Sequence, residues 1–93
     1  MKISASNQVA DWLTALPPQT KKRVRTALRA LARGQGDIKG LQGELEGFSR
    51  LRVGGIRILH RQVSAREIRL EYANTRDVVY EMFRQFLAGD ESD

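Results

Sequence analysis

Residues 50–63, RLRVGGIRILHRQV, constrain the fold more than any other part of the sequence. Two runs of β-forming residues flank a Gly-Gly pair, and two-residue hairpin turns favour glycine because they need positive φ angles. A turn at Gly54 and Gly55 fixes which residues of the two strands lie opposite each other. The predicted pairs are Val53 with Ile56, Arg52 with Arg57, Leu51 with Ile58, and Arg50 with Leu59.

This register sorts the hairpin side chains onto two faces. One face is apolar and should pack against helices: Leu51, Val53, Ile56 and Ile58. The other face carries four arginines: Arg50, Arg52, Arg57 and Arg61. Like charges directly opposite each other destabilise a sheet by about 0.2–1 kcal/mol, a cost that a bound anion would reverse. The arginines are therefore candidate phosphate ligands; the alternative is a solvated face whose arginines pair with acids such as Glu67 and Glu71.

His60 is the single histidine of the chain. Strand parity places it on the apolar face together with Ser49. We predict a partly buried, hydrogen-bonded histidine rather than a catalytic one.

Helical periodicity before the hairpin predicts a helical hairpin. Apolar residues recur at helical spacing over residues 7–16 and again over residues 18–32, with Pro17-Pro18 between the two helices. Residues 2–5 are a strand candidate. Glycine-rich residues 34–47 are predicted to be a loop with Leu41 and Leu45 held by the core; they match no phosphate-loop or dinucleotide motif.

The remaining elements complete an α+β domain. Strands over residues 48–53, 56–63 and 67–72 predict an antiparallel meander, followed by a helix over residues 76–87 with Asn74 or Thr75 as its N-cap. The expected buried stripe of that helix is Val79, Met82, Phe83, Phe86 and Leu87. Residues 88–93 read as a frayed acidic tail. The prediction is one domain over residues 1–93: a curved antiparallel sheet with the helical hairpin on one face and an arginine-rich cleft on the other.

Composition narrows the function. The formal net charge is +5, and twelve arginines outnumber four lysines, a bias that suits bidentate phosphate binding. With no cysteine and one histidine, neither a metal site nor a cofactor is expected. No apolar run or signal peptide is apparent, which predicts a cytoplasmic protein without membrane contact.

Two further groups of residues are candidates for nucleic-acid binding. The second helix carries basic side chains that form either a solvated face or a surface for a nucleic-acid backbone: Lys21, Lys22, Arg25 and Arg29, with Arg23 and Arg33 beside them. Arg76 and Tyr80 lie four residues apart on one ridge of the last helix, which would place Tyr80 beside the hairpin arginines.

The order of these elements, together with GFSRLRVGGIRILHR and ANTRDVVYEMF, resembles the RelE/ParE superfamily of bacterial toxins over nearly the whole chain. The resemblance implies a microbial RNase-like fold and a toxin of a type II toxin–antitoxin system. RelE-like members cleave messenger RNA in the ribosomal A site without a metal, the ribose 2′-hydroxyl attacking its own phosphodiester. The implied partners are a cognate antitoxin, the ribosome and messenger RNA.

By position, the resemblance implies catalytic roles for Arg57, Arg76, Tyr80 and Arg52, and phosphate contacts for Arg50. Arg50 and Arg52 fall where some members carry lysines, and arginine cannot serve as a general base near neutral pH. His60 stands where a tyrosine is common. ParE-like members share the scaffold but inhibit DNA gyrase without known nuclease activity, which makes gyrase inhibition the first alternative function. The second alternative is a basic nucleic-acid-binding module without catalysis.

Overall fold

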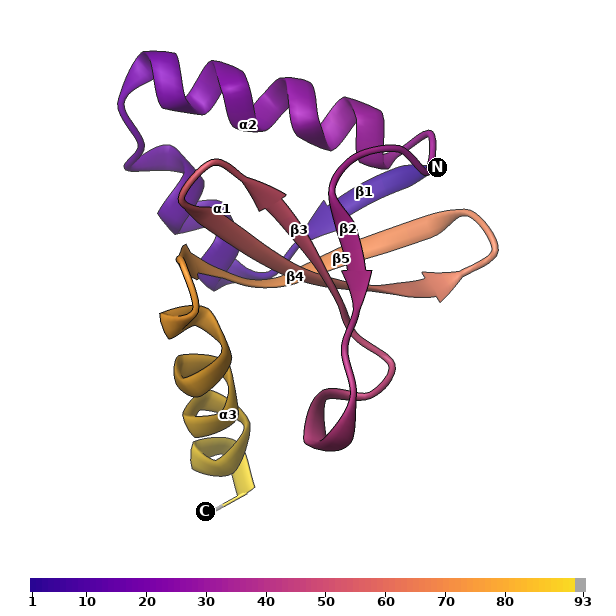
Figure 1. The fold of residues 1–93 in the computed structure, drawn as a ribbon, viewed down its shortest axis with the longest axis vertical. Helices are drawn as coiled ribbons and strands as arrows, with labels where there is room; N and C mark the ends of the chain where they lie inside the picture. The colour runs from indigo at the N-terminus through magenta and orange to yellow at the C-terminus, as the bar shows by residue number, and fades with distance from the viewer. Residues whose placement is uncertain (92–93) are drawn as a thin grey trace.

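The computed structural model describes residues 1–91 and contains nine elements (Figure 1). In chain order they are β1 (Lys2–Ala5), α1 (Asn7–Thr14), α2 (Pro18–Leu31), β2 (Ile38–Gly40), the 3₁₀ turn η1 (Gly43–Leu45), β3 (Ser49–Val53), β4 (Ile56–Ser64), β5 (Glu67–Thr75) and α3 (Val78–Glu91).

One five-stranded sheet with the order β1-β5-β4-β3-β2 forms the centre of the molecule. Strands β3, β4 and β5 make the predicted antiparallel meander, β2 adds to it antiparallel to β3, and β1 pairs in parallel with β5. The β3–β4 register agrees with the sequence prediction at all four pairs, Arg52 opposite Arg57 among them.

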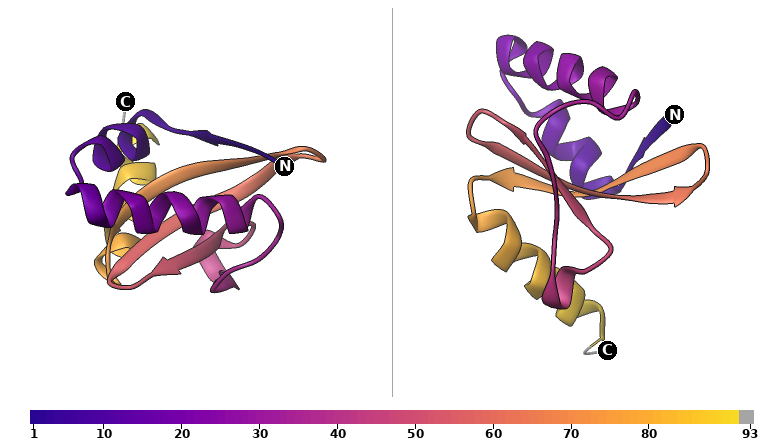
Figure 2. Two further views of the ribbon diagram at one scale, coloured as in Figure 1. Left: turned by 90° about the horizontal axis from the view of Figure 1, so that it is seen from above. Right: turned by 45° about the vertical axis from the view of Figure 1, so that its right-hand side comes forward.

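Helices cover both faces of this sheet (Figure 2). Helices α1 and α2 form the predicted hairpin over the apolar face, where Leu51, Ile56 and Ile58 join their core. Helix α3 packs on the other face around Leu59 and Tyr72, in a second, smaller core. The predicted α+β fold is confirmed, but the face expected to be an open arginine cleft is partly covered by α3.

Side chains of α1 tie this helix to β5. The Ser6 hydroxyl caps α1 by accepting a hydrogen bond from the Val9 N–H at 3.3 Å, and it donates to the Glu71 carbonyl at 2.9 Å. Gln8 donates to the Ala73 carbonyl at 2.8 Å and accepts from the Ala73 N–H at 2.9 Å. These bonds satisfy backbone groups of β5 along the edge that β1 leaves uncovered.

Two predictions of local structure before and after the meander were wrong. Residues 34–47 were expected to be a loop but contain β2 and η1, although Leu45 is buried and Leu41 packs against the second core as predicted. Neither Asn74 nor Thr75 caps α3, because the helix begins at Val78; the Asn74 side chain instead accepts from the Thr75 N–H.

The apolar stripe of α3 is also narrower than predicted. Val79 and Phe83 are buried, whereas Met82 and Phe86 remain 40% and 47% exposed, because the helix contacts the sheet along a single ridge. Residues 88–91, predicted to be frayed, continue α3; residues 92–93 lie outside the described part of the chain. None of the helices within residues 1–91 combines the length and apolar character needed to cross a bilayer.

Candidate functional site

The α3 face of the sheet gathers three of the predicted arginines and one lysine in cross-strand rows. Lys39 of β2 lies opposite Arg50, which lies opposite Leu59. In the next row Arg52 lies opposite Arg57, and Arg57 lies opposite Asn74. Cross-strand neighbours share a face with their Cβ atoms about 5 Å apart, so the strands bring these cations together.

A single carboxylate partly balances this charge. Asp37, just before β2, accepts from Arg52 Nε at 2.6 Å and from Arg50 Nη2 at 3.4 Å. Arg50 is only 9% exposed, and its Nε has no hydrogen-bond partner among residues 1–91. The phosphate contact predicted for Arg50 stays a prediction, and burial makes Arg50 the least accessible of the three arginines.

Arg57 stabilises the hairpin turn with one nitrogen of its guanidinium group. Its Nη1 donates to the Gly54 carbonyl at 2.8 Å and to the Ile56 carbonyl at 3.1 Å. Its Nε and Nη2 make no hydrogen bond within residues 1–91. The guanidinium has five N–H donors, so several remain for an anion.

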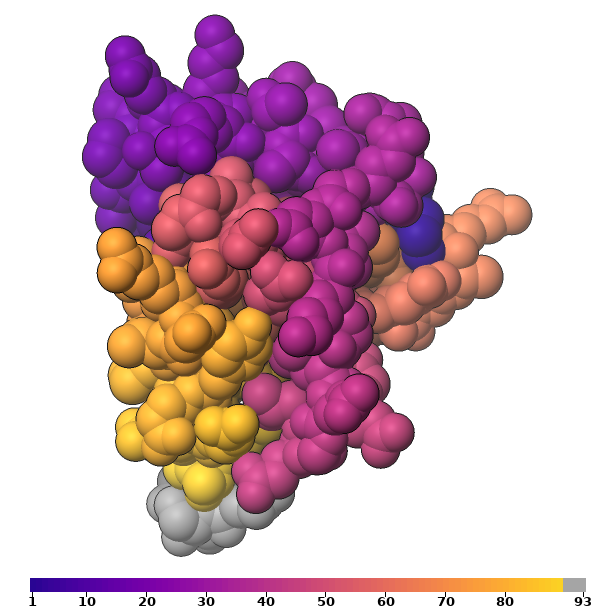
Figure 3. Space-filling view, in the orientation of Figure 1, coloured from indigo at the N-terminus to yellow at the C-terminus, as the bar shows by residue number. Residues whose placement is uncertain are grey.

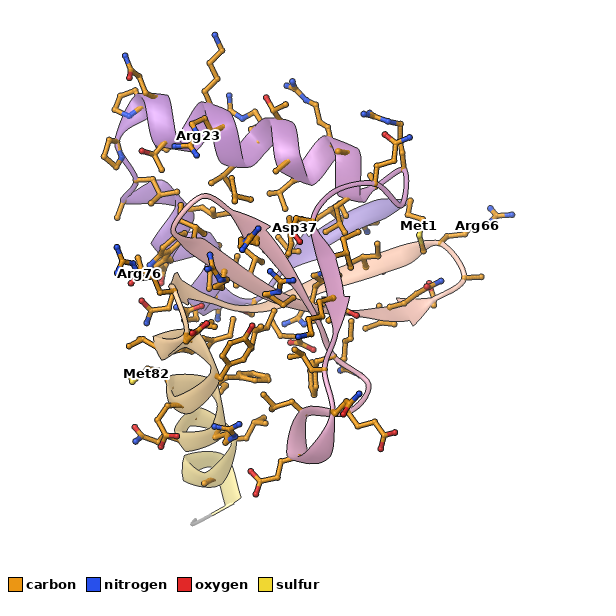
Figure 4. The ribbon with its side chains drawn as sticks, in the orientation of Figure 1. Met1, Arg23, Asp37, Arg66, Arg76 and Met82 are labelled. Atoms are coloured by element: carbon orange, nitrogen blue, oxygen red, sulfur yellow. The ribbon has the colours of Figure 1, made fainter. Side chains whose placement is uncertain are left out.

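Arg76 joins β5 to α3 in an unusual conformation. Its φ angle is +46°, the only positive value at a non-glycine residue within the described chain, and its N–H donates to the Gly55 carbonyl at 2.7 Å. A side chain in this region costs on the order of 1 kcal/mol, and such strain is concentrated at functional sites. Its exposed side chain lies at the rim of the molecule, on the far side of the hairpin from Asp37 (Figure 4).

Tyr80 lies in a groove between α3 and the β2–η1 segment, which we call the Tyr80 groove. The groove has a volume of about 670 Å³, and the two segments form its sides in Figure 3. Its lining residues are Lys39, Gly40, Leu41, Gln42, Asp77, Tyr80, Glu81 and Arg84. The Tyr80 ring packs against the second core, and its hydroxyl has no hydrogen-bond partner among residues 1–91.

Sequence reasoning missed two cations of this groove. Arg84 continues the ridge of Arg76 and Tyr80 with the same spacing of four residues, a signal that was present in the sequence. Lys39 lay in a stretch without periodicity, so only the tertiary structure reveals it.

Arg61 lies apart from the other hairpin arginines. Its Nε donates to Glu71 Oε2 at 2.5 Å, and its guanidinium carbon lies 5.9 Å from the centre of the Phe48 ring. Arg69 donates to the other oxygen of Glu71. For Arg61 the alternative prediction, pairing with an acid, is therefore correct.

The basic side chains of α2 belong to the opposite side of the sheet from the Tyr80 groove. Lys21, Lys22, Arg25 and Arg29 line shallow grooves along α2, and Lys21 Nζ also donates to the Thr14 carbonyl at 3.2 Å. These four residues and the sheet arginines thus form two separate basic surfaces.

His60 is buried on the α1–α2 side, opposite Ser49 on β3 and Leu70 on β5. It is 5% exposed, and its Nε2 has no hydrogen-bond partner within residues 1–91. Burial was predicted correctly, but the expected hydrogen bond is absent at this nitrogen. Desolvation lowers the pKa of His60 from 6.5 to about 4, so the imidazole is neutral at pH 7.

Acidic and histidine side chains do not cluster. Within residues 1–91, no group of three or more His, Cys, Asp or Glu residues is arranged to hold a metal ion. The groups available for chemistry in the Tyr80 groove are therefore the cations Lys39 and Arg84, the Tyr80 phenol and the separate carboxylates of Asp77 and Glu81.

Comparison with solved structures reveals relatives over most of the chain. A RelB-RelE antitoxin–toxin complex from Methanococcus jannaschii matches with a TM-score of 0.66 and 21% identity, covering 86% of this chain and 98% of that one. A YoeB-YefM complex from Staphylococcus aureus matches with 0.66 and 18%, covering 82% and 97%. A YoeB/ParE toxin from Agrobacterium tumefaciens matches with 0.60 and 16%, covering 82% and 99%.

These similarities confirm the RelE-like fold predicted from the sequence. All three proteins are less than 25% identical to this chain, so the likeness establishes the fold. No family model matches the sequence, and no curated protein matches it either.

Proposed function

We propose that this chain, which has the fold of the RelE/ParE superfamily, is the toxin of a type II toxin–antitoxin system and cleaves messenger RNA on the ribosome. The observation that carries the proposal is the opposed pair Arg52 and Arg57, on the same face of the sheet as the Tyr80 groove. Arg52 and Arg57 are direct cross-strand neighbours and Asp37 pairs with only one of them, an arrangement that a phosphodiester would stabilise.

The proposed reaction is an internal transfer. The ribose 2′-oxygen attacks the adjacent phosphorus, the bond from phosphorus to the 5′-oxygen breaks, and the products carry a 2′,3′-cyclic phosphate and a free 5′-hydroxyl. Charge develops on the non-bridging phosphate oxygens, where positioned cations stabilise it. Arg57 offers its free Nε and Nη2 there, and Arg52 offers the guanidinium edge that Asp37 leaves free.

Two further residues complete the proposed site. Arg76 approaches from the start of α3 and adds a third charge to the phosphate. The Tyr80 hydroxyl, unpaired within residues 1–91, donates a proton to the leaving 5′-oxygen. Arginine does not lose its proton in this pH range, so a group of the RNA accepts the proton of the 2′-hydroxyl.

The test is induction of the protein in bacteria followed by mapping of messenger RNA ends. We expect cuts at ribosome-occupied codons with 2′,3′-cyclic phosphate ends. Arg57→Ala and Arg76→Ala should each lower the cleavage rate by a hundredfold to a thousandfold, about 2.7–4 kcal/mol of transition-state stabilisation. Tyr80→Phe should lower the rate without loss of folding, and Arg66→Ala, in the distant β4–β5 turn, is the matched charge control.

One observation favours the second candidate, gyrase inhibition. His60, the single histidine, is buried on the opposite side of the sheet from the Tyr80 groove, so within residues 1–91 no imidazole lies in the groove to act as a general base. If induction triggers the DNA-damage response while messenger RNA stays intact, and the Arg57, Arg76 and Tyr80 variants remain toxic, gyrase inhibition replaces nuclease activity.

A cognate antitoxin is the expected partner. The Methanococcus jannaschii and Staphylococcus aureus relatives were crystallised with RelB and YefM, respectively. The basic surface of α2 suits an acidic, amphipathic segment of such a protein, and the affinity of that complex should fall as salt is added.

A further inference from the structure

The tip of the β3–β4 hairpin carries a cation that the proposed reaction does not use. Arg23 of α2 lies against the turn: a Cβ atom added to Gly54 would be only 2.6 Å from Arg23 Nη2. Arg57 Nη1 donates to the carbonyl of the same glycine at 2.8 Å. Two guanidinium groups, one from each side of the sheet, therefore contact a single turn residue.

The charge at this tip is unbalanced. The ion pairs among residues 1–91 occupy other arginines: Arg50, Arg52, Arg61, Arg69 and Arg84. Neither Arg23, Arg57 nor Arg76 takes part in an ion pair within these residues, and the Arg76 backbone donates to Gly55 of the same turn. The acid next in sequence, Asp77, lines the Tyr80 groove instead.

The turn itself leaves room for a ligand. Gly54 has a φ angle of +59°, which suits glycine, and a Cβ added to Gly55 would meet no atom within 4 Å. Because neither glycine has a side chain, a phosphate can come close to the backbone of the turn. The neighbouring guanidinium groups can bind it there.

We propose that the hairpin tip is a second phosphate subsite, in which Arg23 binds a backbone phosphate of single-stranded RNA next to the phosphodiester that Arg57 contacts. The subsite joins the two basic surfaces, since Arg23 belongs to the helix that carries Lys22 and Arg25, and Arg57 belongs to the α3 face. An RNA strand leaving the Tyr80 groove would thus cross the tip toward α2. The choice of RNA as ligand rests on the proposed function.

The experiment measures binding of the whole chain to a fluorescent single-stranded RNA of about twelve nucleotides, made uncleavable by 2′-O-methyl groups. Anisotropy titrations over a range of salt give both the affinity and its salt dependence. Arg23→Ala should weaken binding roughly tenfold and lower the slope of log K against log salt by about 0.7, the value for one phosphate contact on a single strand. Arg66→Ala, which removes the same charge at the far end of the sheet in Figure 4, should change neither quantity.

Arg23→Gln keeps a polar side chain at this position but removes the guanidinium group and its charge, so it should match Arg23→Ala. Equal binding by wild type and both Arg23 variants would overturn the subsite, as would equal weakening by Arg66→Ala. Because the probe cannot be cut, the result is independent of catalysis. Arg23-dependent binding without messenger RNA cleavage would keep the subsite and remove the nuclease function.

Discussion

Acidification should destabilise this fold through His60, and the size of the effect follows from its environment. The imidazole is buried, its Nε2 is unpaired within residues 1–91, and desolvation lowers its pKa from 6.5 to about 4. Between these two values the unfolded chain binds a proton that the folded chain does not. The stability that the neutral His60 gives the folded state is therefore fully present above pH 6.5. It falls as the pH drops from 6.5 to about 4, and it is lost below about pH 4.

Each pKa unit corresponds to about 1.4 kcal/mol, so the loss is about 2.5 kcal/mol at about pH 4.5 and about 3.5 kcal/mol once it is complete. A small domain has about 5–15 kcal/mol in total, so this is a large fraction. The assay is urea unfolding followed by the fluorescence of Trp12, which packs against the main core. Carboxylates also titrate in this range, so the matched variant His60→Leu is measured beside the wild type.

We expect His60→Leu to unfold with a weaker dependence on pH, the two proteins diverging by about 2.5 kcal/mol between about pH 7.5 and 4.5. Leucine fits the apolar surroundings, with Leu70 directly across the strand pair. Parallel stability curves for the two proteins would refute the reasoning, because they would mean that His60 is protonated in the folded state at no extra cost.

Three further predictions concern single contacts. Asp37→Asn should lower the unfolding free energy by about 1–3 kcal/mol, because it removes the carboxylate that pairs with buried Arg50. The same variant should bind RNA more tightly in the anisotropy assay, because it frees Arg52. Gln8→Ala should cost about 1–3 kcal/mol in urea unfolding, because both backbone groups of Ala73 lose their partner; unchanged stability would show that water replaces the amide. Gly54→Ala should lower the thermal unfolding midpoint, because holding alanine at a φ angle of +59° costs about 1 kcal/mol. Gly40→Ala should leave the midpoint nearly unchanged, because a Cβ atom there meets no other atom within 4 Å.

The predictability of this fold depends on how local the determining interactions are. The β3–β4 register followed from sequence because Gly54-Gly55 and the alternation around it are neighbours in the chain. Strand β2 could not be predicted, since its three residues have no periodicity of their own and exist as a strand only by pairing with β3. Tertiary context overrides local preference in such short segments.

The functional site was also predictable only where the determining residues are close together in the sequence. That Arg52 and Arg57 share a face followed from strand parity, but the capture of Arg50 and Arg52 by Asp37 required the position of β2. The predicted buried stripe of α3 was too wide, because both sides of that helix carry apolar residues. The sequence alone does not show which side contacts the sheet. Met82 and Phe86 were therefore assigned to a core that Val79 and Phe83 fill.

The parallel pairing of β1 with β5 has a consequence for how the chain folds during synthesis. The partners of Ile3 and Ala5 are Ile68 and Leu70, and Ser6 is 65 residues away from its acceptor at Glu71. The meander of β3, β4 and β5 contains only short-range connections and can close early, whereas joining β1 to it requires closure of a long loop. Strand β1 is thus made long before its partner, and it waits unpaired until β5 has been made 65 residues later (from Lys2 to Glu67).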